Sequence, residues 1–465
     1  MESFANMVWW RALKGPLAVT RYHGRPRPLV CWTSCRLWMN PSKPHVVMRW
    51  IGANANLADS PAKPIASGWN WETTSQISWQ VEALPMWLEM QNVGNQAKRI
   101  YLDHHATSPL RPEALAVFTS LMQANPSSVH QDGREARRLM EDCRQIIADI
   151  AGFAPRNVVF TSGGTEANQS AILGLGADTL LYGATEHPCV LAAADEFVRR
   201  GGQAFMIPVD NHGLIDPELF AEMLSHSAGK VLVAIMAANN ETGVMQDVTS
   251  LGSIARSHGA LLHVDAVQIF GKLSIQSWSW VCDSMSISAH KFGGPQGIGA
   301  LLLRDGLSFE PLIRGGGQEL GRRSGTENMP GIAAMAQALK ASLAGQTHYE
   351  ELTSSLRELE DELCAQVPEL QVAGKHALRP IPVSCFVAPK LEAQLQLIKA
   401  DIAGLSLSSG SACSSGKVTP SHVLEAMGYD AAAARRALRV SAGWSNSHED
   451  LRSFGKFYEG LMKPH

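Results

Sequence analysis

A lysine, an aspartate and a glycine-rich helix start are the residues of this sequence whose types and spacing suggest chemistry. Lys291 stands in SISAHKFGGPQGIG, between an apolar run typical of a strand and a turn rich in glycine. A lysine amine in such a place can form a Schiff base with a carbonyl cofactor. A single lysine is more often a solvated surface residue, so the interpretation depends on what lies near it.

Asp265 changes that balance. It ends an apolar run in HVDAVQ, and an unpaired buried carboxylate is costly, so a cationic partner is expected. A pyridinium nitrogen is such a partner, because a carboxylate beside it keeps the ring protonated as an electron sink. A structural salt bridge is the commoner fate of a lone buried aspartate.

A phosphate-binding turn and a histidine complete the set. Gly164 and Thr165 open a predicted helix and offer backbone N–H groups and a hydroxyl to a phosphate. His187 follows another strand end, where it can stack on an aromatic ring, transfer a proton or simply pack in the core. A lysine for an aldehyde, an acid for a ring nitrogen and a helix start for a phosphate together indicate pyridoxal 5'-phosphate.

Apolar runs alternate with amphipathic helical stretches from Ile100 onward. Runs that are apolar on both faces and separated by helices predict a mostly parallel sheet covered on both sides, an α/β fold. Ligands bind such sheets at the carboxyl ends of the strands, where the polar residues of this sequence gather. The predicted strands are 157–162, 178–185, 230–237, 260–267, 284–290 and 297–304.

Composition and charge exclude several classes. The chain has 465 residues, enough for two or three domains, and its net charge of -3 argues against direct nucleic-acid binding through bulk charge. There is no apolar run of about 18 residues, so no membrane span is predicted. Eight scattered cysteines indicate reduced thiols in a cytoplasmic setting. Cys31 and Cys35 are close, but no second pair completes a zinc site, and no metal site is predicted.

Residues 1–98 differ from the rest of the chain. They hold nine of the 12 tryptophans, with ten Lys+Arg against five Asp+Glu. Basic composition fits a targeting peptide, but the length and the tryptophans do not. The pattern is too irregular for an extra domain. We favour the hypothesis that this segment is upstream sequence, read from a start codon that was assigned too early. Met86 or Met90 would then be the natural beginning. An intact Met1 in protein from the native host would contradict this hypothesis.

The remaining chain divides into two predicted domains. Residues 99–345 form a large domain with the sheet, and 346–465 form a smaller α+β domain that begins with a polar helix over 348–367. The smaller domain contains SSGSACSSGK, in which Cys413 stands among serines and glycines. From that loop alone, an incidental exposed thiol is the simpler interpretation.

From about Tyr101 to Trp444, the sequence resembles the cysteine desulfurases, pyridoxal-phosphate enzymes of the class V aminotransferase group. Such an enzyme has the fold-type I architecture, with a mostly parallel seven-stranded sheet in its large domain. The matching motifs occur in the family's order: YLDHHATSP, FTSGGTEAN, TEHPCV, NNETGVMQDV, HVDAVQ, SISAHKFGGPQGIGAL, GGGQELGRRSGTEN and SSGSACSSG.

The resemblance implies a role for each matching position that touches the cofactor. Lys291 would bind the aldehyde, Asp265 the ring nitrogen and Gln268 the ring hydroxyl. His187 would stack on the ring and take part in proton transfer. The phosphate would be held by Gly164, Thr165, Ser288 and His290.

The resemblance also implies a homodimer whose site needs both chains. Thr326 of RSGTEN would reach the phosphate from the partner subunit. Asn240 would contact both cofactor and substrate. Arg439 would bind the carboxylate of the substrate, L-cysteine, as a fork.

Cys413 then becomes the nucleophile. It would take the substrate's sulfur, leaving a persulfide on the protein and alanine as product, and a polar loop suits a thiol that must reach two sites. A sulfur-acceptor protein, such as an iron–sulfur cluster scaffold, is implied as partner. The alternatives are a selenocysteine lyase, another class V aminotransferase-like enzyme, or a sulfur carrier that has lost catalysis, which the presence of Lys291 and Asp265 disfavours.

Overall fold

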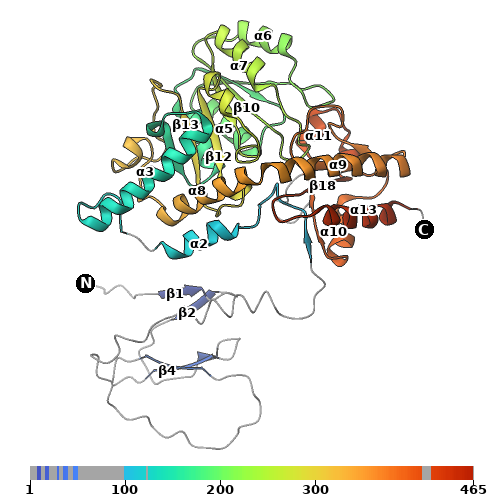
Figure 1. Ribbon diagram of the computed structural model, residues 1–465. Helices are drawn as coiled ribbons and strands as arrows, with labels where there is room; N and C mark the ends of the chain where they lie inside the picture. The colour runs from blue at the N-terminus through green and yellow to red at the C-terminus, as the bar shows by residue number, and fades with distance from the viewer. Residues whose placement is uncertain are drawn as a thin grey trace, which may run out of the picture. The chain divides into compact units, whose positions relative to one another are not determined.

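The computed structural model describes residues 99–121, 124–410 and 420–463, together with the backbone of short strands before residue 51 (Figure 1). β1 pairs antiparallel with β2, and β4 pairs antiparallel with β3 and β5. Runs this short show no period, so the sequence predicted no strand there. Cys31 and the alternative starts Met86 and Met90 lie outside the described residues. The strands are β1 (Val8–Arg11), β2 (Pro16–Val19), β3 (Leu29–Val30), β4 (Cys35–Met39) and β5 (Val46–Trp50).

A separate compact unit, Val93–His465, contains a seven-stranded sheet in the order β7-β13-β12-β11-β10-β8-β9. All neighbouring strands are parallel except β13, which is antiparallel to both β12 and β7. The mostly parallel seven-stranded sheet of the prediction is therefore confirmed. Its strands are β7 (Val158–Thr161), β8 (Thr179–Gly183), β9 (Gln203–Ile207), β10 (Val231–Met236), β11 (Leu261–Asp265), β12 (Ser284–Ser288) and β13 (Gly299–Leu303).

Each of the six apolar runs corresponds to one of these strands, but β9 was missed. It lies at the edge of the sheet, and its Phe205 and Met206 are exposed. An edge strand of this kind lacks the apolar pattern on both faces that identified the others.

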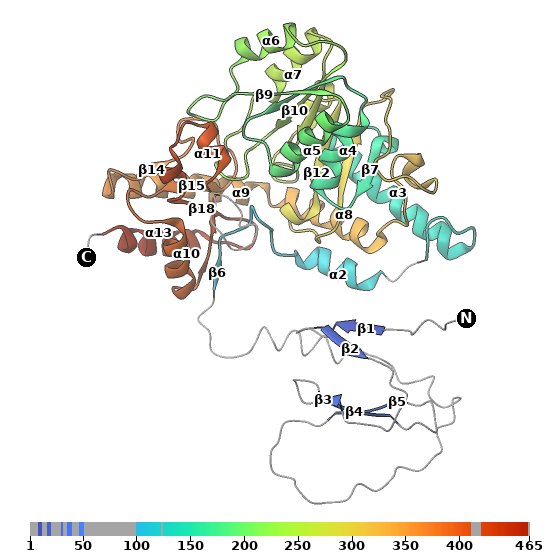
Figure 2. The same ribbon diagram turned by 180° about the vertical axis from the view of Figure 1, so that it is seen from behind.

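Helices cover both faces of the large sheet (Figures 1 and 2). Side chains alternate along a strand, so Val158 and Phe160 of β7 pack in one core cluster and Val159 in another. The first cluster includes residues of α2, α3, α6, α7 and α8, and the second includes residues of α4 and α5. These helices are α2 (Pro112–Ser120), α3 (Gln131–Ala151), α4 (Gly164–Gly174), α5 (Pro188–Arg199), α6 (Pro217–Ser225), α7 (Val248–Ser257) and α8 (Met329–Ala344).

The last part of the chain forms a smaller antiparallel sheet in the order β14-β15-β18-β17. The predicted polar helix is α9, which is followed by the strands and the remaining helices. The strands are β14 (Gln371–Val372), β15 (Val383–Val387), β17 (Ser408–Ser409) and β18 (Ala437–Ser441). The helices are α9 (Gln346–Gln366), α10 (Ala393–Ile402), α11 (His422–Ala426), α12 (Ala431–Ala434) and α13 (His448–Met462).

One early segment joins the later part of the chain. β6 (Ile100–Tyr101) pairs in parallel with β16 (Leu405–Ser406), and Leu102 packs in the same cluster as α9 and α13. The division at residue 345 stays a prediction.

Short 3-10 helices complete the described structure: η2 (Pro155–Asn157), η3 (Gln276–Trp280), η4 (Ala289–Lys291) and η5 (Gln318–Gly321). Within the described ranges, no helix has both the length and the apolar character needed to cross a bilayer.

The smaller core should respond strongly to the loss of one aromatic ring. Phe454 is fully buried, and its ring centroid lies 5.8 Å from Phe386 and 5.3 Å from Tyr458. We expect Phe454→Ala to lower the free energy of unfolding by about 3–5 kcal/mol in denaturant titrations, because buried neighbours fill such a cavity only in part. Phe118→Ala, at a position 39% exposed, is the matched control and should cost much less. Equal losses of unfolding free energy in the two variants would contradict this view of the smaller core.

Candidate active site

The carboxyl ends of the parallel strands bring the predicted polar residues together. His187 follows β8, Asn240 follows β10, and Asp265 is the last residue of β11. Ser288 is the last residue of β12, and Lys291 closes the 3-10 turn η4 directly after it. The site therefore lies where parallel-sheet topology predicts a ligand.

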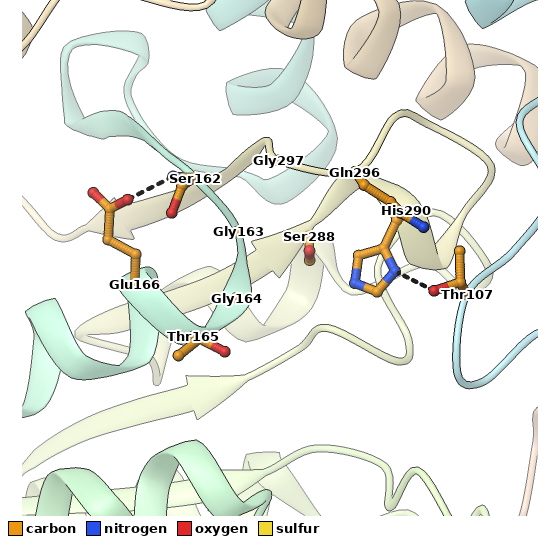
Figure 3. A pocket seen from close by; sticks show the side chains of 10 residues that line it. All are labelled: Thr107, Ser162, Gly163, Gly164, Thr165, Glu166, Ser288, His290, Gln296 and Gly297. Atoms are coloured by element: carbon orange, nitrogen blue, oxygen red, sulfur yellow. Dashed lines mark hydrogen bonds between the residues drawn. The ribbon is translucent and has the colours of Figure 1, made fainter. Parts of the chain in front are cut away.

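A cavity of about 360 Å³ opens at the start of α4. Gly164 is the first helical residue, and a Cβ there would lie 2.7 Å from Val267 Cγ2, so only glycine fits. Gly163 before it has φ 152°, a conformation that glycine adopts without strain. The lining residues, shown in Figure 3, are Thr107, Ser162, Gly163, Gly164, Thr165, Glu166, Ser288, His290, Gln296 and Gly297.

The lining of this cavity suits an anion. The free N–H groups of a helix start and the hydroxyls of Thr165 and Ser288 can donate to a phosphate. His290 Nδ1 lies 3.2 Å from the hydroxyl of Thr107, which orients the ring at the cavity (Figure 3). The four residues predicted to bind phosphate all line this one cavity.

Lys291 lies in surroundings that favour a neutral amine. Its Nζ donates to the carbonyl of Ala106 at 2.9 Å and also to that of His105. Burial, together with the positive charge of Arg439, lowers the pKa of Lys291 to about 7. A neutral amine is the form that reacts with an aldehyde.

Asp265 is a buried carboxylate with one donor on each oxygen. Oδ1 accepts from the backbone N–H of Val267 at 3.0 Å, and Oδ2 accepts from Asn168 Nδ2 at 2.7 Å. Burial raises the pKa of Asp265 and lowers that of His187, which caps α5 by accepting from Cys189 N–H at 3.2 Å. Both shifts express the cost of placing a charge on a group that is largely withdrawn from water.

Gln268 has an unused acceptor at the same place. Its Nε2 donates to the carbonyl of His105 at 3.0 Å, while its buried Oε1 has no hydrogen-bond partner among the described residues. A buried polar atom without a partner is rare, and a ligand hydroxyl would satisfy it.

Arg439 comes from the smaller sheet and contacts two residues outside it, Asp103 after β6 and Asn240 after β10. It is 1% exposed and lies on β18. Nη2 forms an ion pair with Asp103 Oδ1 at 2.8 Å, and Nη1 donates to the carbonyl of Asn240 at 3.3 Å. Within the part of the chain that the structure describes, Nε has no partner.

Four of the predicted site residues line the first cavity, and Thr326 is not one of them. Thr326 is exposed and lines a second cavity of about 110 Å³, which shares Ser162 and Gly297 with the first. Cys413 lies outside the described residues, in the gap 411–419. Its position relative to Lys291 stays a prediction.

The chain on each side of that gap approaches one carboxylate. Ser421 Oγ donates to Glu241 Oε2 at 2.6 Å, and a Cβ on Gly410 would lie 2.8 Å from the same oxygen. Glu241 follows Asn240 directly, and burial raises its pKa to about 7. The described chain on both sides of 411–419 thus lies beside Glu241, the residue after the predicted substrate-binding residue Asn240.

Several residues at the site were not found from the sequence. Thr107, Ser162 and Gln296 line the cavity, and the carbonyl of His105 accepts from both Lys291 and Gln268. All four residues lie in motifs noted from the sequence, which are YLDHHATSP, FTSGGTEAN and SISAHKFGGPQGIGAL. A backbone carbonyl, however, carries no sequence signal.

The chain is similar to known proteins over most of this unit. Residues 100–454 match the family described as aminotransferase class-V. A cysteine desulfurase of Cereibacter sphaeroides is 42% identical over 364 residues, 76% of this chain and 93% of that protein. A cysteine desulfurase of Klebsiella pneumoniae is 39% identical over 354 residues, 74% of this chain and 88% of that protein. The chain belongs to the cysteine desulfurase family.

Solved structures of similar proteins have the same fold as this chain. The X-ray structure of a NifS-like protein from Rickettsia africae has a TM-score of 0.70 at 32% identity, covering 78% of this chain and 99% of that one. The structure of SspA in complex with cysteine has a TM-score of 0.63 at 31% identity, covering 73% and 98%. Cysteine desulfurases of the class V group are pyridoxal-phosphate enzymes, so the fold-type I architecture and the cofactor predicted from the sequence are both confirmed.

The residues of this cysteine desulfurase fit that cofactor. The glycine turn leaves room for a phosphate, Lys291 offers a neutral amine, and the free acceptor of Gln268 suits a ring hydroxyl. The buried carboxyl group of Asp265 suits a protonated ring nitrogen.

Cofactor uptake by the apo-protein should depend on pH through Lys291. Because its lowered pKa leaves the amine neutral above about pH 7, we expect the uptake rate, followed by absorbance, to rise with a midpoint near that pH. Removing a positive charge favours protonation, so Arg439→Gln should move the midpoint to higher pH. Arg435→Gln, at an exposed position, is the control and should leave it unchanged. A wild-type midpoint near the ordinary lysine pKa would contradict the assignment.

Proposed function

We propose that this enzyme removes sulfur from L-cysteine, forms alanine and a persulfide on Cys413, and passes the sulfur to an acceptor protein. The acceptor is a scaffold for iron–sulfur cluster assembly or a component of tRNA thiolation. One observation carries the proposal. Lys291, Asp265 and Arg439 lie close together at the carboxyl ends of the parallel strands, in a chain of this family.

Separate residues would hold the aldehyde, the ring and the phosphate of the cofactor. Lys291 would bind its aldehyde, Asp265 its ring nitrogen and Gln268 its ring hydroxyl, while His187 would stack on the ring. Bound pyridoxal phosphate supplies an electron-withdrawing ring joined to the substrate's amine. The phosphate contacts would come from Gly164, Thr165, Ser288, His290 and, from the partner of a homodimer, Thr326.

The substrate would be oriented by Arg439 and Asn240. The buried guanidinium already accommodates one carboxylate, Asp103, and its unpartnered Nε is available for the carboxylate of L-cysteine. The carbonyl of Asn240, which accepts from Arg439, fixes the position of the fork relative to the large sheet.

Proton transfer would fall to His187 and Lys291. Burial lowers the pKa values of both groups, which favours the neutral forms that can accept a proton. In the net reaction, the carbon–sulfur bond of cysteine breaks and a sulfur–sulfur bond to Cys413 forms. The carbon that loses sulfur gains a proton, so cysteine and thiol give alanine and persulfide with no external oxidant.

The other cysteines support Cys413 as the acceptor of sulfur. Five free cysteines are described, and burial raises their thiol pKa values, to about 11 for Cys143 and about 12 for Cys189. A raised pKa suppresses the thiolate, which is the reactive form. Free thiols also suit a reducing compartment, and we place the enzyme in the cytoplasm on that ground.

The decisive test is replacement of the proposed nucleophile. We expect Cys413→Ala to lose sulfide release from cysteine almost completely, while the absorption change on adding cysteine persists because cofactor and substrate binding remain intact. Cys364→Ala, a partly exposed cysteine, is the matched control and should release sulfide at the wild-type rate. Undiminished release by Cys413→Ala would favour a selenocysteine lyase or another class V enzyme that does not use this thiol.

A further inference from the structure

A series of buried hydrogen bonds links Asp265, at the end of β11, through a side chain of α4 to a second residue of β11 and to β12. Asn168 Nδ2 donates to Asp265 Oδ2 at 2.7 Å, and Asn168 Oδ1 lies 2.9 Å from His263 Nε2. His263 Nδ1 lies 2.8 Å from Ser284 Oγ. All four side chains are at most 3% exposed. Because water does not reach them, each depends on its neighbours for hydrogen bonds.

Sheet register and helix spacing bring these groups together. His263 and Asp265 are two residues apart on β11, so their side chains share a face of the sheet, and His263 is paired with Ser284 on β12. Asn168 lies about one helical turn after Gly164 in α4. The helix whose first residues line the cavity therefore also supplies the amide that contacts Asp265.

The partners fix which atom donates at each step. A carboxylate only accepts, so Asn168 turns its NH₂ toward Asp265 and its oxygen toward His263. Donation to that oxygen requires the proton of the neutral ring on Nε2, which also lies 3.3 Å from Ser286 Oγ. Nδ1 is then the acceptor for the hydroxyl of Ser284. Burial lowers the pKa of His263 to about 3, in agreement with a neutral imidazole.

We propose that Asn168 and His263 are positioning residues that hold the Asp265 carboxylate ionised and oriented toward the ring nitrogen of the cofactor. The inference rests on the proposed function, which gives Asp265 that nitrogen as its partner. Removing Asn168 would leave a buried carboxylate with one donor fewer, and a proton would then compete with the ring nitrogen for its charge. Removing His263 would free the amide of Asn168 to rotate.

The test compares two cofactors on the apo-protein. One is pyridoxal phosphate, and the other is its analogue in which carbon replaces the ring nitrogen. Asn168→Ala and His263→Leu should weaken binding of the natural cofactor about 10- to 100-fold, the size expected for a lost hydrogen bond to a charged group. Binding of the carbon analogue should be unchanged, because it has no ring nitrogen for Asp265 to hold.

Two further variants separate positioning from packing. His263→Gln keeps one donor and one acceptor at the same place, and it should restore wild-type affinity for the natural cofactor. Asn157→Ala is the matched control, because Asn157 is also buried and donates to a carboxylate, that of Asp305, at 2.6 Å. It should leave the affinity for both cofactors unchanged.

Distinct results separate failure of the inference from failure of the function on which it rests. Equal loss of affinity for both cofactors in Asn168→Ala and His263→Leu would overturn the inference and leave a structural role. Unchanged affinity for both would overturn it as well. If the wild type itself bound the two cofactors equally well, the assignment of Asp265 to the ring nitrogen would fail first.

Discussion

The burial of the Asp265 carboxyl group is the constraint on which the rest of the site depends. A carboxylate that water does not reach is costly unless donors and a positive partner surround it. The structure supplies the donors from two elements, the turn after β11 and the helix α4. The parallel sheet places that carboxylate beside the end of β12, where Lys291 follows, so that acid and amine lie at the same end of the sheet.

The second requirement is that two sheets contribute to one site. Arg439 belongs to the small antiparallel sheet, yet its contacts are with Asp103, which follows β6, and with the carbonyl that follows β10. Its charge lowers the pKa of Lys291 across that junction. Gly410 and Ser421, on the two sides of 411–419, both lie beside Glu241.

Much of this arrangement was predictable because it follows from simple patterns. Apolar runs predicted six strands of the large sheet, and strand ends followed by Asp265, His187 and Lys291 predicted one site. The edge strand β9 was missed because its exposed Phe205 and Met206 break the pattern. Hydrogen bonds such as those of Asn168 and the carbonyl of His105 could not be predicted, since they depend on how a helix and a loop pack against the sheet.

Asp265 as the partner of a protonated ring nitrogen is the central claim, and the ¹⁵N spectrum of the holoenzyme with ring-labelled pyridoxal phosphate tests it most directly. We predict the chemical shift of a protonated pyridinium nitrogen over the whole pH range in which the protein stays folded, because the buried carboxylate holds that proton in place. The shift of an unprotonated pyridine at neutral pH would contradict the account.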